Sequence, residues 1–283
     1  MFYNIKLLNL MKIKSFRTNI RKYDVTKDHV NFYKENGYLI LRNIFSRLEM
    51  KSLDNSIKKF VDKGWHNIMN PDRAEFIVSQ SFEKLYSLKN LNEKVNFVLS
   101  AQKTANLWRK FLIDPRIKKI IEQLTHKKFN ALMSHIIFKR ANTKYAKMAW
   151  SPHQDNSYSQ MSGDSLVTLN LFIHNSNKKN GGLYIYPKTH KLGLIGSVKK
   201  KSYDAKPSQK PGNKVSINLN NFEKVDLSNK SGDLYIMNGN LIHGSYPNNS
   251  KKLSRHMISF VYGEKNKKFN SGITAQRQVI KFK

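Results

Sequence analysis

Short runs of β-forming residues make up the second half of the chain, and this pattern constrains the fold more than any other feature. From Phe129 onward, apolar and β-branched runs alternate with turns rich in Gly, Asn, Ser and Pro, and no helical run separates them. The predicted strands are Ala131–Arg140, Leu166–Ile173, Leu183–Tyr186, Val215–Leu219, Asp233–Met237 and Arg255–Tyr262. Many short strands without intervening helices indicate a β-sandwich or a β-barrel.

The first part of the chain has mainly helical spacing. The predicted elements are a helix over 26–36, a strand over 38–41, a helix from 46 to 64 and mostly helical structure over 80–125. Ser46 and Glu49 form a capping box at the start of the second helix, and Asp114-Pro115 starts the last one. We therefore expect one domain over 24–283, with helical support over 24–126 and a β core over 129–263.

The first 23 residues contain no acidic side chain and mix Lys and Arg with apolar residues. A transit peptide, an interfacial helix and a start of translation at Met11 are all compatible with this composition. We expect an ordinary basic N-terminal segment that is partly disordered.

The absence of cysteine limits the chemistry of the chain. It excludes disulfides, thiol nucleophiles, thiolate zinc sites and iron–sulfur clusters, so a metal site must use His and carboxylate ligands. It also agrees with a reducing compartment, and we expect a cytoplasmic protein. No apolar run approaches the ~18–20 residues of a membrane span.

The formal net charge of +32 is large enough to raise the question of a nucleic-acid partner. However, Lys, Asn and Ile are abundant together along the whole chain, which indicates compositional drift. The chain has no zinc finger, helix-turn-helix or RNA-binding aromatic signature. We therefore expect no nucleic-acid partner, and keep a basic nucleic-acid-binding protein as an alternative.

A candidate metal motif follows the first long strand. An extended backbone would place His153 and Asp155 on one face, with Gln154 pointing away. Two imidazoles and one carboxylate form the facial triad of non-haem Fe(II) oxygenases, and His243 is the candidate for the third ligand. The His-x-Asp motif alone is weak, because nine His and 19 acidic residues produce such matches by chance.

Several other motifs follow this one in a recognisable order. They are Glu35-Asn36-Gly37-Tyr38-Leu39-Ile40-Leu41, Trp150, His153-Gln154-Asp155, Asn180-Gly181-Gly182, Pro187-Lys188-Thr189-His190, Gly232-Asp233, His243 and Arg255. This order resembles the phytanoyl-CoA dioxygenase family of Fe(II)/2-oxoglutarate-dependent oxygenases. The resemblance implies a double-stranded β-helix (a cupin-like jelly roll) with flanking N-terminal helices, in which His153, Asp155 and His243 bind iron.

The resemblance also implies the cosubstrate site. Arg255 would pair with the distal carboxylate of 2-oxoglutarate, since a guanidinium is permanently charged and matches a carboxylate bidentately, and Ser245 would add a hydroxyl. His135 and Lys139 share strand parity, and with Asn170 they are weaker candidates for cosubstrate contacts.

The chain departs from the family pattern at several positions. Ser151-Pro152 is inserted before the His, and Lys188-Thr189 replaces Gly-Ser. Asn170 stands where the family often has Trp, and His135 where it often has Gln. These changes leave the three metal ligands in place and affect the fit of 2-oxoglutarate. The remaining histidines, His174 and His256 among them, have no partner pattern and are expected to be ordinary.

The implied activity is hydroxylation of an unactivated C–H bond of a small-molecule metabolite, with Fe(2+), 2-oxoglutarate and O2 consumed or bound, and succinate and CO2 released. Asp155 favours hydroxylation, because related halogenases lack this carboxylate. The Lys-rich segment 193–214 is expected to be a lid or a disordered insertion, and its charge would suit an anionic substrate. A non-catalytic jelly-roll binding protein is the other alternative.

Overall fold

The structure is a computed structural model. It describes residues 15–17, 24–62, 75–77, 97–99, 101–103, 105–142, 145–147, 149–200, 212–272 and 277–282. The basic segment predicted over 1–23 lies outside this set apart from 15–17, as does the part 80–96 of the stretch predicted to be helical.

A large, almost entirely antiparallel sheet forms the base of the fold. Its order is β1 (Ser15–Arg17), β2 (Tyr38–Arg42), β12 (Leu234–Asn238), β7 (Leu166–Phe172), β14 (Arg255–Glu264), β5 (Phe129–Lys139), β4 (Phe97–Leu99) and β3 (Glu75–Ile77). Only the β1–β2 pair is parallel among these. The long strands β5 and β14 pair along their whole length, with Arg255 opposite Lys139 and Ser259 opposite His135.

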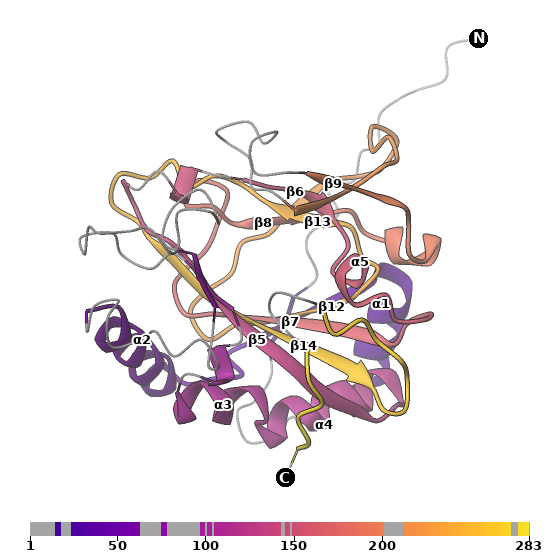
Figure 1. Cartoon of the computed structure of the whole chain (residues 1–283), viewed down its shortest axis with the longest axis horizontal. Coiled ribbons are helices and arrows are strands. Elements are labelled where there is room, and N and C mark those ends of the chain that lie inside the picture. The colour runs from indigo at the N-terminus through magenta and orange to yellow at the C-terminus, as the bar shows by residue number, and fades with distance from the viewer. Residues whose placement is uncertain are drawn as a thin grey trace.

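A small sheet faces the large one across the core (Figure 1). Its order is β11 (Val225–Asp226), β8 (Leu183–Ile185), β13 (His243–Ser245) and β6 (Trp150–His153), and β9 (Ser197–Lys200) and β10 (Gly212–Val215) form a separate hairpin. From β5 to β8, and again from β12 to β14, successive strands alternate between the large and the small sheet. This alternation is the jelly roll, so the predicted double-stranded β-helix is confirmed.

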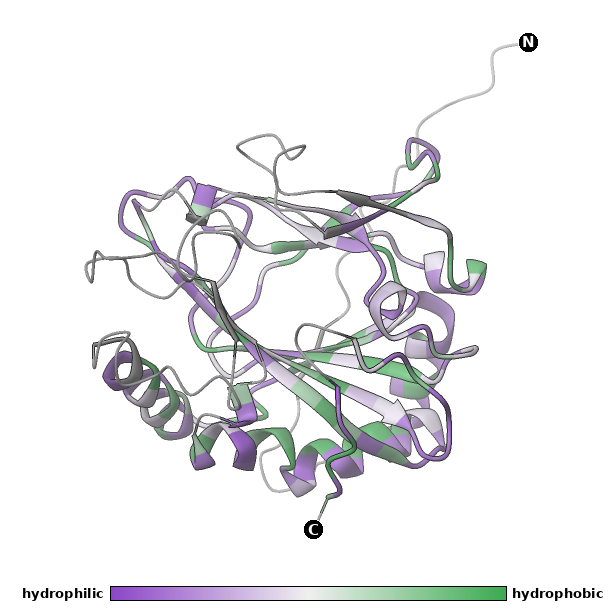
Figure 2. Ribbon diagram, in the orientation of Figure 1, coloured by the Kyte–Doolittle hydropathy of each residue, from purple (hydrophilic) through white to green (hydrophobic). Residues whose placement is uncertain are grey.

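Two apolar layers hold the fold together. One lies between the large sheet and the helices and includes Leu39, Trp108, Ile121 and Phe260. The other lies between the two sheets and is smaller, because polar side chains of the site interrupt it. In Figure 2 the helices under the large sheet show hydrophobic and hydrophilic residues on the same element, as expected for helices that cover one face of a sheet.

The helices are α1 (Lys27–Asn36), α2 (Arg47–Asp62), α3 (Asn106–Leu112), α4 (Pro115–Thr125) and the short α5 (Asn156–Ser159), with 3-10 turns at Ala101–Lys103, Tyr145–Lys147 and Thr189–Leu192. The predicted capping box of α2 is present: the Ser46 amide donates to Glu49 Oε2 at 2.7 Å, and the Glu49 amide donates to Ser46 Oγ at 3.2 Å. The predicted start of α4 is also confirmed, with Asp114 as N-cap.

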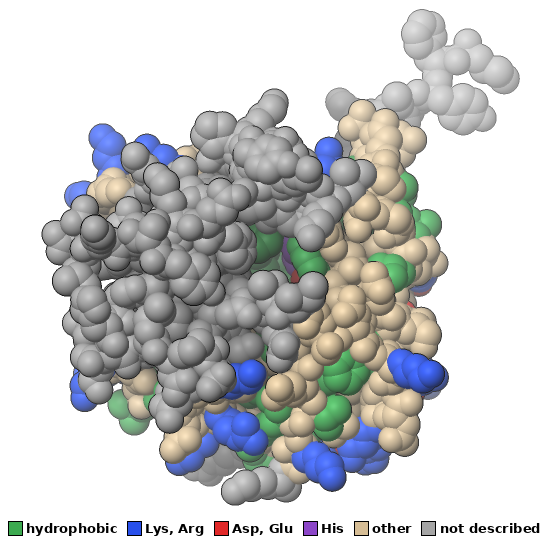
Figure 3. Space-filling view, in the orientation of Figure 1, with side chains coloured by type: hydrophobic (Ala, Val, Ile, Leu, Met, Phe, Trp, Pro, Cys, Tyr) green, Lys and Arg blue, Asp and Glu red, His purple; other side chains and the backbone are tan. Residues whose placement is uncertain are grey.

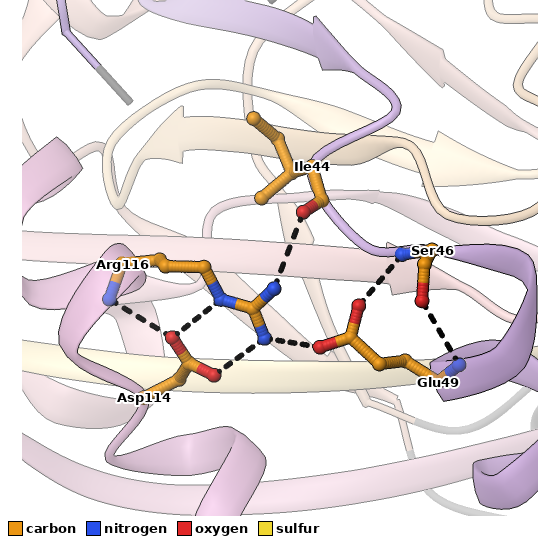
Figure 4. A network of polar contacts seen from close by, with 5 residues as sticks. All are labelled: Ile44, Ser46, Glu49, Asp114 and Arg116. Atoms are coloured by element: carbon orange, nitrogen blue, oxygen red, sulfur yellow. Dashed lines mark hydrogen bonds and ion pairs between the residues drawn. The ribbon is translucent and has the colours of Figure 1, made fainter. Parts of the chain in front are cut away.

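Arg116 connects the starts of α2 and α4 (Figure 4). Its guanidinium donates to both carboxylate oxygens of Asp114, at 2.9 and 2.8 Å, and to Glu49 Oε1 at 2.5 Å. The acids therefore serve two purposes, since each caps its own helix and each accepts from the same cation.

Arg116→Ala is expected to lower the free energy of unfolding by about 1–2 kcal/mol, because hydrogen bonds to charged groups contribute about 1.5–3 kcal/mol and this pair is partly screened by solvent. Lys119→Ala is the matched control: its pair with Asp24 is about half exposed, and its loss should change stability by less than ~0.5 kcal/mol. Urea unfolding of both variants checks this, and equal losses would contradict it.

The structure corrects two predicted elements. The strand predicted over 215–219 ends at Val215 and belongs to the β9–β10 hairpin, so part of 193–214 is a hairpin, while 201–211 lies outside the described residues. Phe97–Leu99, predicted as helix, is a strand that pairs with β5. The periodicity of so short an apolar run does not distinguish helix from strand. Here residues 97–99 are extended because they pair with the edge of the long strand β5. The support region 24–126 is therefore not purely helical.

Within the described part of the chain, no helix combines the length and the apolarity that a membrane span requires.

Candidate metal centre

His153 and His243 are brought together by the pairing of β6 with β13. The two residues are direct cross-strand partners in this antiparallel pair, and their ring centroids lie 4.4 Å apart. Residues directly opposite in an antiparallel ladder have neighbouring side chains on the same face. The predicted third ligand therefore lies beside the first.

Asp155 reaches the same point by a turn. β6 ends at His153, and Asp155 has helical backbone angles (φ −63°, ψ −30°) as the residue before α5. The expected extended backbone is therefore wrong for this residue, although its carboxylate still faces the imidazoles. Asp155 Oδ1 lies 3.6 Å from His153 Nε2 and 3.7 Å from His243 Nε2.

These three side chains fit a divalent metal ion. One donor atom from each lies within 4.8 Å of the others. Nδ1 of His153 lies 2.7 Å from the Ser151 carbonyl oxygen, and Nδ1 of His243 lies 3.1 Å from that of Leu241. A carbonyl only accepts, so each Nδ1 carries the proton and each Nε2 keeps its lone pair for a metal, which is the usual arrangement around metal-binding imidazoles.

The electrostatics of the site keep the ligands in their binding forms. Burial lowers the pKa of His243 to about 4, so its imidazole is neutral at neutral pH. Burial alone would raise the pKa of Asp155, but His243 and His153 hold it below its ordinary value, so the carboxylate is charged. Figure 3 shows His and acidic atoms at the bottom of a hollow, beside hydrophobic atoms.

Gln154 fixes the backbone between the two ligands of this motif. As predicted, its side chain points away from them: it donates to the carbonyl oxygens of Gly193 (2.7 Å) and Asn240 (2.6 Å) and accepts from the Ile195 amide (2.8 Å). The Gln therefore ties the metal motif to the start of the 193–214 segment and to the turn between β12 and β13.

A cluster of buried cations lies on the inner face of the large sheet. Arg255 and Lys139 are cross-strand partners, and both are completely buried. The Arg255 guanidinium donates to the Gly181 carbonyl oxygen at 2.9 and 3.2 Å, and Lys139 Nζ donates to Ser245 Oγ at 2.8 Å. The structure thus brings together Arg255, Lys139 and Ser245, three of the five residues predicted to contact the cosubstrate.

The Asn-Gly-Gly motif shapes this cluster. Gly181 has φ +86°, and a Cβ there would lie 2.7 Å from Lys139 Cδ. Only glycine combines this backbone angle with so close an approach. The motif therefore presents a carbonyl to Arg255 while leaving room for the lysine.

His135 and Asn170 lie in one row of the large sheet, on either side of Ser259. Burial lowers the pKa of His135 to about 4, and the charge of Asp155 acts in the opposite direction, which puts His135 within electrostatic reach of the metal ligands. His135 thus faces the small sheet together with Lys139, as their strand parity predicted, and Asn170 lies in the same row as His135.

Arg277 is a residue that the sequence did not single out. It lies beyond the last strand, in a stretch without a motif. Its amide donates to the Ser271 carbonyl oxygen, and the neighbouring Asn270 amide donates to Ser159 in α5, so the C-terminal segment packs beside the helix that follows Asp155. Its Nε is buried without a hydrogen-bond partner among the described residues, and its charge interacts with Asp155 and Tyr158.

The buried histidines make stability depend on pH. Burial lowers the pKa of His135, His243 and His256 from 6.5 to about 4. Between these values the unfolded chain binds protons that the folded chain does not, so stability must fall as pH decreases from 6.5 to 4. The depressed Asp155 pKa acts below pH ~4 and does not cancel this.

For the chelator-treated protein we expect the free energy of unfolding to rise by about 4 kcal/mol per pH unit near pH 5, about 1.4 for each of three protons. His256→Gln should remove about one third of this slope. Urea titrations between pH 4.5 and 6.5 measure it, and a flat profile would refute the assignment.

Comparison with known proteins agrees with this site. A family model described as phytanoyl-CoA dioxygenase (PhyH) matches residues 33–257. Phytanoyl-CoA dioxygenase 1 of Oryza sativa is 28% identical over 258 residues, covering 83% of this chain and 88% of its own length. The peroxisomal phytanoyl-CoA dioxygenase of Homo sapiens is 25% identical over 256 residues, covering 87% and 72%.

Solved structures share the fold at lower identity. Apo EctD from S. alaskensis has a TM-score of 0.66 at 16% identity, covering 90% of this chain and 82% of EctD. The non-haem α-ketoglutarate-dependent carbocyclase SnoK from nogalamycin biosynthesis has a TM-score of 0.65 at 17% identity, covering 88% of each chain. The family match spans both the metal motif and the buried cation cluster, and the chain belongs to the phytanoyl-CoA dioxygenase family of Fe(II)- and 2-oxoglutarate-dependent dioxygenases.

Proposed function

We propose that the chain hydroxylates an unactivated C–H bond of a small-molecule metabolite, with His153, Asp155 and His243 as the ligands of Fe(II). The observation that carries this proposal is the convergence of two Nε2 atoms and one Oδ1 atom within 4.8 Å. In both imidazoles Nδ1 faces a backbone carbonyl oxygen, so Nε2 is the nitrogen that can bind the metal.

The side chains of the protein would bind the metal, orient the cosubstrate and substrate, and set the charge of the site. When bound, iron, 2-oxoglutarate and O2 supply the oxidation: one oxygen atom enters succinate as CO2 leaves, and the other enters the C–H bond. His153, His243 and the Asp155 carboxylate would hold the metal and would leave its other positions to cosubstrate and water. The Asp155 carboxylate fills a position that a halide would need, and this favours hydroxylation.

Arg255, Lys139 and Ser245 would hold 2-oxoglutarate. They lie on the inner face of the sheets and present a guanidinium, an ammonium and a hydroxyl close together. Arg255 would take the distal carboxylate through its planar fork, while Lys139 and Ser245 would bind the same carboxylate from the side. His135 and Asn170, two rows further along the same face of the sheet, would contact the rest of the cosubstrate.

The substrate that fits best is an anion. Arg277 brings a partly buried guanidinium to the side of α5 that carries Asp155, and it acts electrostatically on His135, Asp155 and Tyr158. This charge is separate from the Arg255 cluster, which comes from the opposite end of β14. A partly buried cation near the metal ligands, in addition to those for the cosubstrate, selects a carboxylate, phosphate or phosphonate group on the substrate.

Succinate release tests the proposed function. The purified chain with Fe(II), ascorbate and 2-oxoglutarate is expected to form succinate slowly alone and faster with the correct metabolite, and a library should contain matched anionic and neutral members. His153→Ala should remove both rates. Iron binding without any succinate under all conditions would refute the proposal.

Arg277→Gln is expected to raise KM for the anionic substrate by about 10- to 100-fold, the equivalent of one partly buried ion pair, with a smaller change in kcat. Arg277→Lys should recover part of the affinity, because it keeps the charge and loses the planar fork. Steady-state kinetics with the library hit measure this. If KM for the library hit were the same in the wild type and in Arg277→Gln, the anionic assignment would be contradicted.

A further inference from the structure

A second group of metal-ligating side chains lies on the other face of the large sheet. It consists of Asp54 in α2, His174 directly after β7 and His256 in β14. Asp54 Oδ1 lies 3.1 Å from His174 Nε2 and 3.4 Å from His256 Nδ1, and the three donor atoms all lie within 4.8 Å of one another. Three elements far apart in the sequence therefore direct one donor each to one point.

The proton positions around His174 leave a place for a second proton or a metal ion at that point. Its Nδ1 lies 3.3 Å from the Ser254 carbonyl oxygen, which only accepts, so Nδ1 carries a proton. In a neutral imidazole Nε2 is then a bare lone pair, and it faces Asp54 Oδ1, another acceptor. Two lone pairs at this distance repel unless a second proton or a metal ion lies between them.

The Asp54 carboxylate is charged, and only its Oδ1 atom is directed at the two imidazoles. Burial would raise the pKa of Asp54, but its contacts with His174, His256 and Lys58 hold it below its ordinary value. Lys58 Nζ lies 2.7 Å from Oδ2, which leaves Oδ1 directed at the two imidazoles. Burial also lowers the pKa of His256 to about 4, so this imidazole is neutral at neutral pH.

The iron triad provides an internal standard for this geometry. There too each imidazole directs one nitrogen at the carboxylate, at 3.6 and 3.7 Å. Nδ1 of His174 faces a backbone carbonyl, as both Nδ1 atoms of the triad do, whereas Nε2 of His256 is buried without a hydrogen-bond partner among the described residues. The separations of 3.1 and 3.4 Å in the second cluster are shorter. Donors in a tetrahedral site with bonds of about 2.0–2.1 Å lie about 3.3 Å apart, so the second cluster matches a small tetrahedral ion.

We propose that Asp54, His174 and His256 form a second metal site, which binds a divalent transition ion of the Zn²⁺ class with water as the fourth ligand. Partial exposure of the His174 side chain (29%) provides a path from solvent, whereas His256 is almost buried and anchors the site. The ion ties α2 to the ends of β7 and β14. It lies on the opposite face of β14 from Arg255, one residue away, and thus supports the strand that carries the cosubstrate anchor.

The site is tested with Zn²⁺ alone in the full chain from which metal has been stripped. His153→Ala/His243→Ala removes the first site, so binding in this background reports only the second. We expect one Zn²⁺ per chain, measured by competition with a chromophoric chelator, and a Co²⁺ derivative with the visible absorption of a tetrahedral site. Adding His174→Gln or Asp54→Asn should weaken Zn²⁺ binding by at least about 100-fold, more than the ~10–100-fold loss usual for outer-shell partners.

Controls separate this site from adventitious binding and from the first site. His126→Asn removes an exposed histidine and should leave Zn²⁺ affinity unchanged. If the double background variant does not fold, the wild type decides, with two ions per chain falling to one in Asp54→Asn. No Zn²⁺ binding in the background, or binding that neither substitution weakens, overturns the proposal and leaves the three side chains as a hydrogen-bonded cluster. Neither result bears on the iron triad.

Discussion

His243→Ala is expected to abolish succinate formation, with a loss of at least about a thousandfold, because it removes one of the three proposed ligands to Fe(II). Loss of an outer-shell partner alone costs ~10–100-fold in metal affinity or activity, and a ligand itself contributes more. His243 is also the cross-strand partner of His153, so its removal leaves the remaining imidazole and carboxylate without the third donor that closes the face. Iron content by metal analysis and succinate by chromatography are the measurements.

The control for this variant must separate the loss of a ligand from the loss of the fold. His243→Ala shortens a buried side chain at the bulged pair of β13 with β6, so circular dichroism and the urea midpoint are compared first. His126→Asn, an exposed histidine at the end of α4, should keep both iron and succinate formation. A folded His243→Ala variant that still bound one iron per chain and turned over 2-oxoglutarate would disprove the proposed triad.

The order of motifs predicted the metal site better than local geometry did. His153, Asp155 and His243 were selected from the sequence, and the structure places their donor atoms together. The reason given for the first pair was an extended backbone, whereas Asp155 lies in a helical turn before α5. The backbone can change from extended to helical within two residues. The spacing of His153 and Asp155 therefore does not show whether the strand continues between them or ends at the first.

Strand parity was more reliable for the cosubstrate cluster, because β5 and β14 are long and regular. Lys139 and His135 were placed on one face from their spacing, and their register with Arg255 and Ser259 agrees. Residues that reach the site from irregular segments had no such signal. Arg277 comes from the C-terminal segment and is positioned by backbone hydrogen bonds to 271 and by the bridge of Ile280 to β5.

The second cluster was missed for a related reason. His174 and His256 were expected to be ordinary, since neither has a ligand-like neighbour in the sequence. Their common partner, Asp54, lies in α2 and is 120 positions from His174 and 202 from His256. Only the packing of α2 against the ends of β7 and β14 brings the three together, and no single-sequence pattern encodes a contact between a helix surface and two strand ends.

Arg255→Lys is expected to raise KM for 2-oxoglutarate by about 100-fold, and Arg255→Gln by more, while iron binding stays intact. The guanidinium is completely buried and its orientation is set by two hydrogen bonds to the Gly181 carbonyl oxygen. Truncating one partner of a buried, hydrogen-bonded charge pair costs about 2–5 kcal/mol, which is roughly 30- to 4,000-fold at 1.4 kcal/mol per tenfold. Lysine keeps the charge and loses the fork, so its effect lies in the lower part of this range.

This prediction is specific to the cosubstrate, because KM for 2-oxoglutarate should change while the affinity for iron should not. Arg255 lies in β14, whereas the metal ligands lie on β6, α5's first turn and β13, so the substitution leaves the triad untouched. Lys139→Met provides a second point, since Lys139 is the cross-strand partner of Arg255 and donates to Ser245 Oγ; it should raise the same KM by a smaller factor. If Arg255→Lys changed iron uptake and left KM for 2-oxoglutarate unaltered, the buried cations would be supporting the metal face, and the diacid would have to bind elsewhere.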